Sequence, residues 1–193
     1  MTETNTNRIH RAGFVNIVGN PNVGKSTLMN ALVGERLSII TSKAQTTRHR
    51  ILGIVNGEDF QMVYSDTPGV LSPNYRLQEK MLEFSRSALV DADVLLYVTD
   101  VQDNADRNAD FLSKVKHLAA AGTRVFLIIN KIDLPAAHPE EVISEIEDII
   151  GIPASDAPRV SAKTGLNVAS VLDEIVDKIP SPSGDENASL QEL

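Results

Sequence analysis

The stretch GNPNVGKS, residues 19–26, decides the fold of this 193-residue chain. It comes directly after the apolar run Phe14–Val18 and directly before a stretch with helical spacing, so it forms the loop between a strand and a helix. Gly19 and Gly24 allow backbone conformations that turn amide hydrogens inward, and the following helix adds the positive end of its dipole. This combination predicts a phosphate-binding P-loop. A glycine-rich loop of chance composition is the alternative.

The side chains at the end of this loop have the chemistry that a nucleoside triphosphate requires. Lys25 is expected to neutralise the β and γ phosphates, which makes it a catalytic candidate, and the Ser26 hydroxyl is expected to ligate Mg²⁺. The predicted nucleotide contacts of the loop are Gly19, Asn22, Val23, Gly24, Lys25, Ser26 and Thr27.

A second motif, DTPG at residues 66–69, follows the alternating stretch 60–64. Asp66, at the end of a strand beside the P-loop, is a candidate to hold Mg²⁺ through water. The backbone amide of Gly69 is a candidate to contact the γ-phosphate, which makes Gly69 a catalytic candidate. A Thr-Pro-Gly sequence alone is most often only a turn, so its weight comes from its position after the P-loop.

Two further motifs predict recognition of guanine. In NKID, residues 130–133, the Asp133 carboxylate can accept hydrogen bonds from N1–H and the exocyclic amine of guanine, which adenine does not offer. Asn130 is expected to join the loops on the base side, and the stem of Lys131 to cover the purine face. In SAKTG, residues 161–165, the amide near Ala162 is expected to donate to guanine O6. The predicted base contacts are Asn130, Lys131, Asp133, Ser161, Ala162 and Lys163.

The segment KAQTTRHR, residues 43–50, lies between the P-loop helix and the next strand. A threonine hydroxyl there can join the metal ligands when the γ-phosphate is present and leave after hydrolysis, as a switch does. We expect Thr47 rather than Thr46 in this role, so Thr47 is both a metal-binding and a catalytic candidate. The basic residues of the segment can contact RNA or form a solvated loop, and both interpretations stay open. These residues are Lys43, Arg48, His49 and Arg50.

Apolar strand-like runs alternate with longer helix-like stretches along the rest of the chain. The expected elements span residues 14–18, 26–33, 51–55, 61–64, 77–90, 94–98, 109–121, 125–129, 139–150, 159–160 and 168–179. This alternation predicts an α/β fold of the P-loop NTPase kind, a small GTPase-like domain with a mostly parallel central sheet and helices on both faces. We expect the GTPase domain at residues 9–180, between a flexible N-terminus at 1–8 and a flexible acidic tail at 181–193.

Composition and charge exclude several other classes of protein. Lys+Arg 18 against Asp+Glu 26 gives a net charge of -8, which opposes broad attraction to nucleic acid or anionic lipid. The chain has no cysteine, so disulfides and Cys-ligated metals are excluded. No apolar run is long enough to span a membrane and no signal sequence is evident, so a cytoplasmic protein is expected.

Residues 11 to about 130 closely resemble the amino-terminal domain of Era-type GTPases, which act in bacterial ribosome assembly. The resemblance is carried by AGFVNIVGNPNVGKSTLMNALVGERLSI, KAQTTRHRILGI and YSDTPGV. From about residue 130 the chain resembles translation-factor GTPases of the LepA type, through NKIDLPAAHPEEV, EIEDIIGI, ASDA, SAKTG and IPSPSGD. The simplest account is a hybrid domain joined where both families share NKID. A natural, divergent Era-type protein is the alternative.

The Era-type resemblance implies a molecular switch that hydrolyses GTP to GDP and phosphate slowly. Val70 stands where many small GTPases place a water-orienting glutamine, and the resemblance points to GTPases that use K⁺ held partly by the P-loop asparagine, here Asn22. A role of Asn22 in loop shape alone is the alternative. Era-type proteins continue into a KH domain that binds small-subunit ribosomal RNA, and no GXXG-bearing KH segment occurs here, so ribosome binding is expected to be weakened. The rival function is a nucleotide-binding module with little or no hydrolysis.

Overall fold

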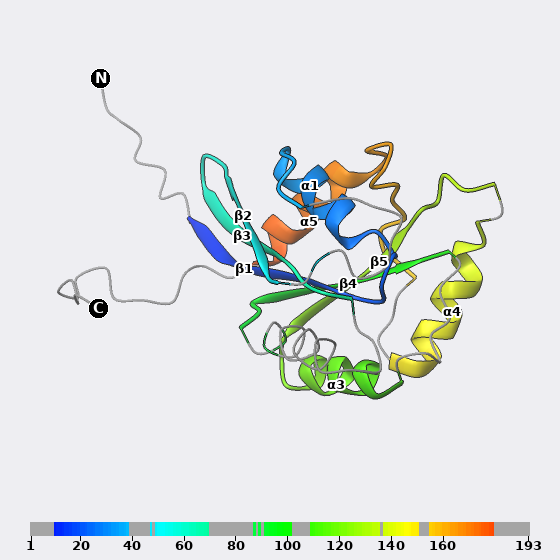
Figure 1. The fold of residues 1–193 in the computed structure, drawn as a ribbon. Coiled ribbons are helices and arrows are strands. Elements are labelled where there is room, and N and C mark those ends of the chain that lie inside the picture. Colours follow the sequence, from blue (N-terminus) through cyan, green and yellow to red (C-terminus); the bar gives the residue numbers. More distant parts are fainter. Residues whose placement is uncertain are drawn as a thin grey trace, which may run out of the picture.

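A five-stranded sheet forms the centre of the computed structural model, which describes residues 10–38, 47, 49–69, 87, 89, 91–101, 109–135, 137–150 and 155–179. The strands are β1 (Arg11–Val18), β2 (Ile51–Asn56), β3 (Phe60–Asp66), β4 (Val94–Asp100) and β5 (Arg124–Asn130). They lie in the order β2-β3-β1-β4-β5, and only the β2·β3 pair is antiparallel (Figure 1). The mostly parallel sheet predicted from the sequence is confirmed.

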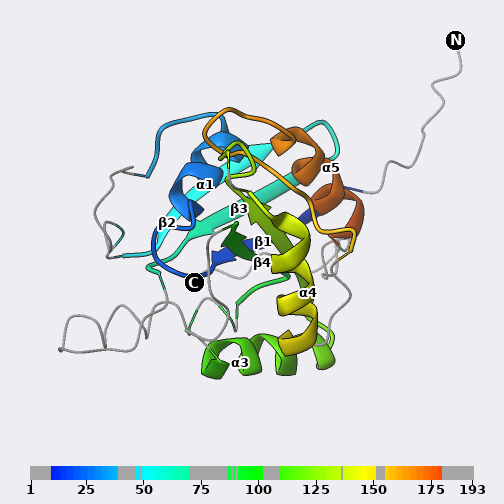
Figure 2. The ribbon, with the colours of Figure 1, turned by 90° about the vertical axis from the view of Figure 1, so that its right-hand side faces the viewer.

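Helices cover both faces of this sheet, as predicted. They are α1 (Lys25–Val33), α3 (Ala109–Ala120), α4 (Pro139–Ile150) and α5 (Val168–Lys178). α1 and α5 lie on one face, whereas α3 lies on the other with α4 beside it (Figures 1 and 2). Each pair of helices closes its own cluster of buried apolar side chains, so the sheet separates two cores.

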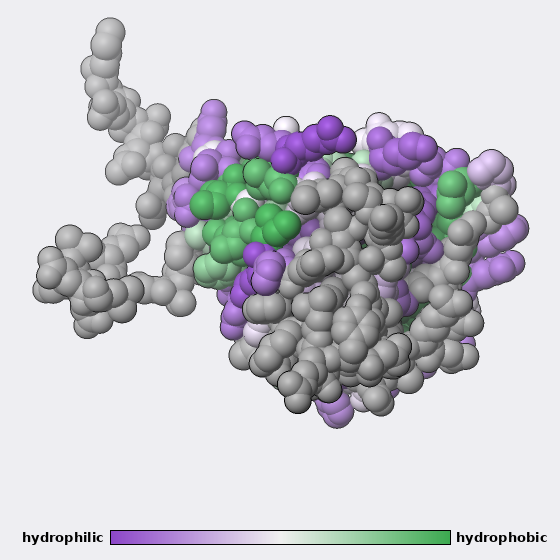
Figure 3. Space-filling model, in the orientation of Figure 1, coloured by the Kyte–Doolittle hydropathy of each residue, from purple (hydrophilic) through white to green (hydrophobic). Residues whose placement is uncertain are grey.

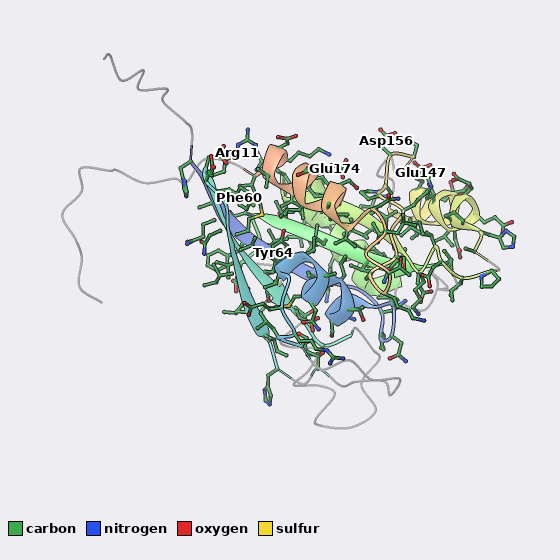
Figure 4. The ribbon with its side chains drawn as sticks, turned by 90° about the horizontal axis from the view of Figure 1, so that it is seen from above. Arg11, Phe60, Tyr64, Glu147, Asp156 and Glu174 are labelled. Atoms are coloured by element: carbon green, nitrogen blue, oxygen red, sulfur yellow. The ribbon has the colours of Figure 1, made fainter. Side chains whose placement is uncertain are left out.

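The burial of each strand follows from its place in the sheet. All seven residues of β4, VLLYVTD, are buried, because β4 lies inside the sheet and is covered on both faces. On β3, Phe60 and Tyr64 contribute to the core beneath α1 and α5 (Figure 4). Burial raises the pKa of the Tyr64 hydroxyl. Arg11, at the start of β1, donates a hydrogen bond to the carbonyl of Val176 and so joins β1 to α5.

The edge strand β2 leaves apolar side chains in solvent. Leu52 is 53% exposed and Ile54 is 58% exposed, and Ile54 is in register with Val63 of β3 and, beyond it, with Phe14 of β1. Figure 3 shows an apolar patch on this side of the molecule. The alternation in ILGIVN therefore reflects a strand with one covered face.

The structure differs from the predicted elements at one point. Residues 159–160 form no sixth strand: Arg159 makes only an isolated parallel bridge with Ile129. The chain turns directly afterwards, where the Gly165 amide donates to the Ser161 carbonyl at 2.9 Å, so too few extended residues remain for a ladder.

Several predictions concern residues outside the described part of the chain. Of the helix expected at 77–90, only Ser87 and Leu89 are described, both helical. The other predictions that lie outside the described residues concern the termini 1–8 and 181–193, and the side chains of Lys43, Thr46, Arg48 and Val70. No helix among the described residues has both the length and the apolar character needed to cross a bilayer.

Candidate nucleotide-binding site

The carboxyl ends of four parallel strands bring the sequence motifs together. The register pairs Ile17 with Asp66 and Asp100 with Asn130, so β1, β3, β4 and β5 end along the same edge of the sheet. The P-loop leaves β1 there and enters α1 at Lys25. Ligands of open α/β sheets bind outside such an edge.

The P-loop has a backbone that only certain residues can adopt. Gly24 has φ 97°, and a Cβ atom placed on it would lie 2.3 Å from Nδ2 of Asn130. Asn22, which is exposed, has φ 66°, in the left-handed region where asparagine is one of the tolerated residues. The conformation turns the loop tightly into the N-terminus of α1, where unpaired amide hydrogens favour an anion.

Lys25 extends across the inside of this loop. The side chain is 6% exposed, and its Nζ donates to the carbonyl of Gly19 at 3.1 Å and to that of Asn20 at 2.7 Å. A fixed positive charge thus lies within the loop that the sequence predicts to surround phosphate. The neighbouring Val23 is 2% exposed and packs in the core, so only its backbone is available for a nucleotide.

The three residues predicted to bind metal lie in contact with one another. Ser26 Oγ donates to Asp66 Oδ2 at 2.6 Å, and Thr47 Oγ1 donates to the same oxygen at 3.3 Å. The two hydroxyl oxygens are 3.1 Å apart. Asp66 is fully buried, and its Oδ1 atom has no hydrogen-bond partner among the described residues.

This cluster fits Mg²⁺. The ion prefers oxygen ligands and is usually held by one or two carboxylates together with substrate phosphates rather than by a cage of protein ligands. One buried carboxylate with an unpartnered oxygen and two adjacent hydroxyls supply that donor set beside the P-loop. A buried carboxylate without a full set of partners is costly, and a cation would compensate it.

The DTPG turn is fastened to the same end of the sheet. Thr67 Oγ1 donates to the carbonyl of Ile17 at 2.7 Å. Gly69 lies so close to the P-loop that a Cβ atom there would be 2.7 Å from both N and Cα of Pro21. Any larger residue at position 69 would therefore separate this turn from the P-loop. The expected contact between the Gly69 amide and the γ-phosphate stays a prediction.

On the base side, one buried asparagine joins three segments. Asn130 is 2% exposed; its Nδ2 donates to the Val23 carbonyl at 2.9 Å, and its Oδ1 accepts from the Ala162 amide at 3.0 Å. The P-loop, the NKID loop and the SAKTG loop are thereby held together. The sequence predicts that an amide near Ala162 donates to guanine O6, and the amide of Ala162 itself donates to Asn130.

The remaining base-side candidates lie nearer the surface. Lys131, with φ 64°, forms an ion pair with Asp100, whereas Asp133 and Lys163 are exposed. Among the described residues none pairs with the Asp133 carboxylate, so it is available to a ligand. Ser161 is buried, and its Oγ accepts from the Thr164 amide at 3.2 Å, so Ser161 shapes its loop.

Two residues of the site were missed in the sequence interpretation. Asp100 ends β4 and holds the ammonium of Lys131; the signal was an acidic residue closing an apolar run, as at Asp66. Arg50 was grouped with the basic residues that can contact RNA or form a solvated loop. The structure adds that its guanidinium has three side-chain partners within the protein, Ser65, Asn16 and Asp91.

Comparison with known proteins places this geometry among GTPases. The model of a family described as 50S ribosome-binding GTPase matches residues 14–131. The structure is similar to Aquifex aeolicus Era bound to GDP and AlF4⁻, with 32% identity and a TM-score of 0.74 over 90% of this chain and 58% of that chain. It is also similar to Era in complex with MgGDPNP and nucleotides 1506-1542 of 16S ribosomal RNA, with 32% identity and a TM-score of 0.74 over 93% of this chain.

The chain spans 61% of that second Era chain, so the match concerns one part of a longer protein. The G domain of the T. maritima FeoB iron transporter shares the fold, with 23% identity and a TM-score of 0.56 over 86% of this chain and 98% of that one.

Proposed function

This chain belongs to the family of 50S ribosome-binding GTPases, and from that membership we propose that it binds GTP with Mg²⁺, hydrolyses it slowly to GDP and phosphate, and works as an Era-like switch. The observation that carries the proposal is the contact among Ser26, Thr47 and Asp66 beside the P-loop. Thr47, which lies outside the P-loop and DTPG motifs, reaches this cluster, as expected of a switch segment that responds to the γ-phosphate.

The chain's own groups divide the work of phosphoryl transfer. Lys25 offsets the charge of the β and γ phosphates, and the amides at the start of α1 donate to them. The Ser26 and Thr47 hydroxyls and the Asp66 carboxylate would hold the metal, which supplies neutralisation of charge on the phosphate oxygens when bound. Gly69, held against Pro21, would present its amide to the γ-phosphate.

Specificity for guanine rests on Asp133 and Lys163. The Asp133 carboxylate is free to accept from the guanine N1–H and amine, and adenine would leave it unpaired. Because the Ala162 amide donates to Asn130, we assign guanine O6 to the Lys163 amide, which has no acceptor among the described residues. The ion pair with Asp100 would hold the stem of Lys131 along the purine face.

Slow turnover is proposed because Val70 has an alkyl side chain, which cannot orient the attacking water. Potassium held partly by Asn22 would offset charge that develops on the phosphoryl group. The exposure of Asn22 and its left-handed backbone at the rim of the P-loop support this placement.

The deciding test is phosphate release from GTP in a single turnover with Mg²⁺. We expect release that requires Mg²⁺ and is not supported by ATP at similar concentration. Tight GTP binding without release would support the rival binding module. Equal binding of ATP would contradict the guanine assignment.

The part of the chain from about residue 130 onward supports a separate proposal, that the domain is a hybrid with a LepA-like second part. Asn130 lies at the proposed joint and bonds to Val23 on one side and Ala162 on the other, so a junction inside NKID keeps both contacts. The two parts should then unfold in one cooperative transition. Two separate transitions would contradict a properly packed hybrid.

A contact with small-subunit ribosomal RNA is proposed on the basis of the Era complex alone. Because the net charge of -8 opposes non-specific attraction, any contact should be confined to a short surface. Retention of the protein by small-subunit RNA that falls as salt rises would support it. No retention at low salt would contradict it.

A further inference from the structure

Arg50 makes an unusual set of contacts for a residue just outside a strand. It stands directly before β2 and three residues after Thr47. Its Nε donates to Ser65 Oγ at 2.6 Å, its Nη2 to Asn16 Oδ1 at 3.0 Å and its Nη1 to Asp91 Oδ2 at 2.8 Å. One planar guanidinium group therefore joins the beginning of β2 to β3, to β1 and to the segment that leads into β4.

These contacts lie next to the predicted metal ligands Ser26, Thr47 and Asp66, on the other face of β3. Ser65 and Asn16 are fully buried and are paired in the β1·β3 ladder, and Ser65 immediately precedes Asp66. Side chains alternate between the two faces of a strand. Ser65 and its partner Arg50 therefore lie on the opposite face of the sheet from the contact between Asp66 and Ser26. The ladder pairs Ile51, the residue after Arg50, with Asp66.

We propose that Arg50 is a positioning residue for the Mg²⁺-GTP site. By fixing the beginning of β2 against β3 and β1, it holds the short connection back to Thr47, so that the Thr47 hydroxyl stays within reach of Ser26 and Asp66. The inference rests on the proposed function and adds to it a residue that touches neither nucleotide nor metal.

The geometry explains why arginine serves here. Guanidinium donors point in fixed, separate directions and meet three acceptors at once, whereas the ammonium of lysine is a single point charge on a flexible stem. Of the three contacts, the one to Asp91 is the weakest restraint, because the Asp91 side chain is 52% exposed and solvent screens the pair. The restraint therefore comes mainly from Ser65 and Asn16.

The test compares Arg50→Lys with Asp91→Asn in the full chain. For each we would measure the Mg²⁺ dependence of single-turnover phosphate release, and the affinities for GDP and for a non-hydrolysable GTP analogue. Arg50→Lys should raise the half-saturating Mg²⁺ concentration about 10- to 100-fold, the usual cost of losing a residue that orients a metal ligand. GDP affinity should stay within about twofold, because the Thr47 ligand is used when the γ-phosphate is present. Asp91→Asn should change both quantities little.

A second pair of variants separates positioning from folding. Ser65→Ala removes the acceptor on β3 and should shift the Mg²⁺ dependence in the same direction as Arg50→Lys. In a Thr47→Ala background, Arg50→Lys should add almost nothing, because both changes act through one hydroxyl.

Equal losses of GDP and GTP-analogue affinity in Arg50→Lys would overturn the proposal and leave Arg50 a general structural role. An unchanged Mg²⁺ dependence would overturn it as well. If the unaltered chain neither binds nor hydrolyses Mg²⁺-GTP, the proposed function itself fails. If the unaltered chain does so and the Arg50 variant matches it, only this inference fails.

Discussion

The phosphate end and the base end of the site are built in different ways. At the phosphate end the polar groups are buried or half-buried and are bonded within the protein: Lys25 to loop carbonyls, and Ser26 and Thr47 to Asp66. At the base end the groups that would touch the ligand are exposed, as at Asp133, and one buried residue, Asn130, holds their loops together.

The difference reflects what each end has to recognise. Phosphate charge is offset best by fixed groups in a site that excludes water, where electrostatic interactions are strong. The edge of a base is recognised by matching donors and acceptors, which need direction more than burial. At the phosphate end, the residues that would contact the ligand also support the structure of the site. At the base end, Asn130 supports the loops and other residues, such as Asp133, would contact the ligand.

The change with the largest expected effect is at the exposed base end, where the ligand contact can be altered without disturbing the fold. Asp133→Asn should shift the preference from guanine toward xanthine nucleotides, because the amide can donate to the xanthine O2. The change in the ratio of affinities should approach about 10⁴-fold, since the wrong base leaves the polar groups of both partners unpaired in the complex. Competition titrations with GDP and XDP measure it. Asp156→Asn, an exposed carboxylate on another turn, is the control, and equal preference shifts in both would contradict the assignment.

At the phosphate end, Lys25→Ala should weaken GDP and GTP binding together. A hydrogen bond to a charged group contributes about 1.5 to 3 kcal/mol, which corresponds to about 10- to 100-fold in the dissociation constant. Calorimetric titration checks this, with the surface residue Lys178→Ala as the matched loss of charge. Unchanged affinity would mean that the loop does not surround phosphate.

Asn130→Ala tests the claim that support and contact are separated at the base end. The Val23 carbonyl and the Ala162 amide would both lose their partner, so the free energy of unfolding should fall by about 1 to 3 kcal/mol even without nucleotide. Denaturant unfolding measures it. Asn56→Ala removes an exposed hydrogen bond with Gln61 and should lower the free energy of unfolding by much less. Similar losses in both variants would show that Asn130 does not hold the loops of the base end together.

The smallest effect is expected at the exposed rim of the phosphate end. Replacing Na⁺ with K⁺ at equal ionic strength should raise GTP turnover several-fold if the ion binds Asn22, because K⁺ would offset transition-state charge. Asn22→Ala should remove the difference between the salts. Identical rates in both salts for both proteins would leave Asn22 with a role in loop conformation only.

Much of the site could be predicted because each motif is local. GNPNVGKS, DTPG and NKID each combine a strand end with the residues that follow it, so alternation of apolar runs places them at one edge of a parallel sheet. The limit of this reasoning appears at residues 159–160, where the short segment Arg159–Val160 predicted a strand. A strand also needs several consecutive residues paired with a neighbouring strand. The turn after Val160 ends the pairing with β5 after the single bridge between Arg159 and Ile129.

The sequence by itself determined the order and chemistry of the motifs, because glycine torsions, a lysine charge and a carboxylate are properties of single residues in a short context. Only the tertiary structure decided which partner each polar group takes. Arg50 reaches Asn16 across 34 residues, and Asn130 reaches Val23 across 107, distances along the chain at which no local pattern constrains a hydrogen bond. Such pairs form because each buried polar group needs a partner, and the packing of the sheet decides which one is near.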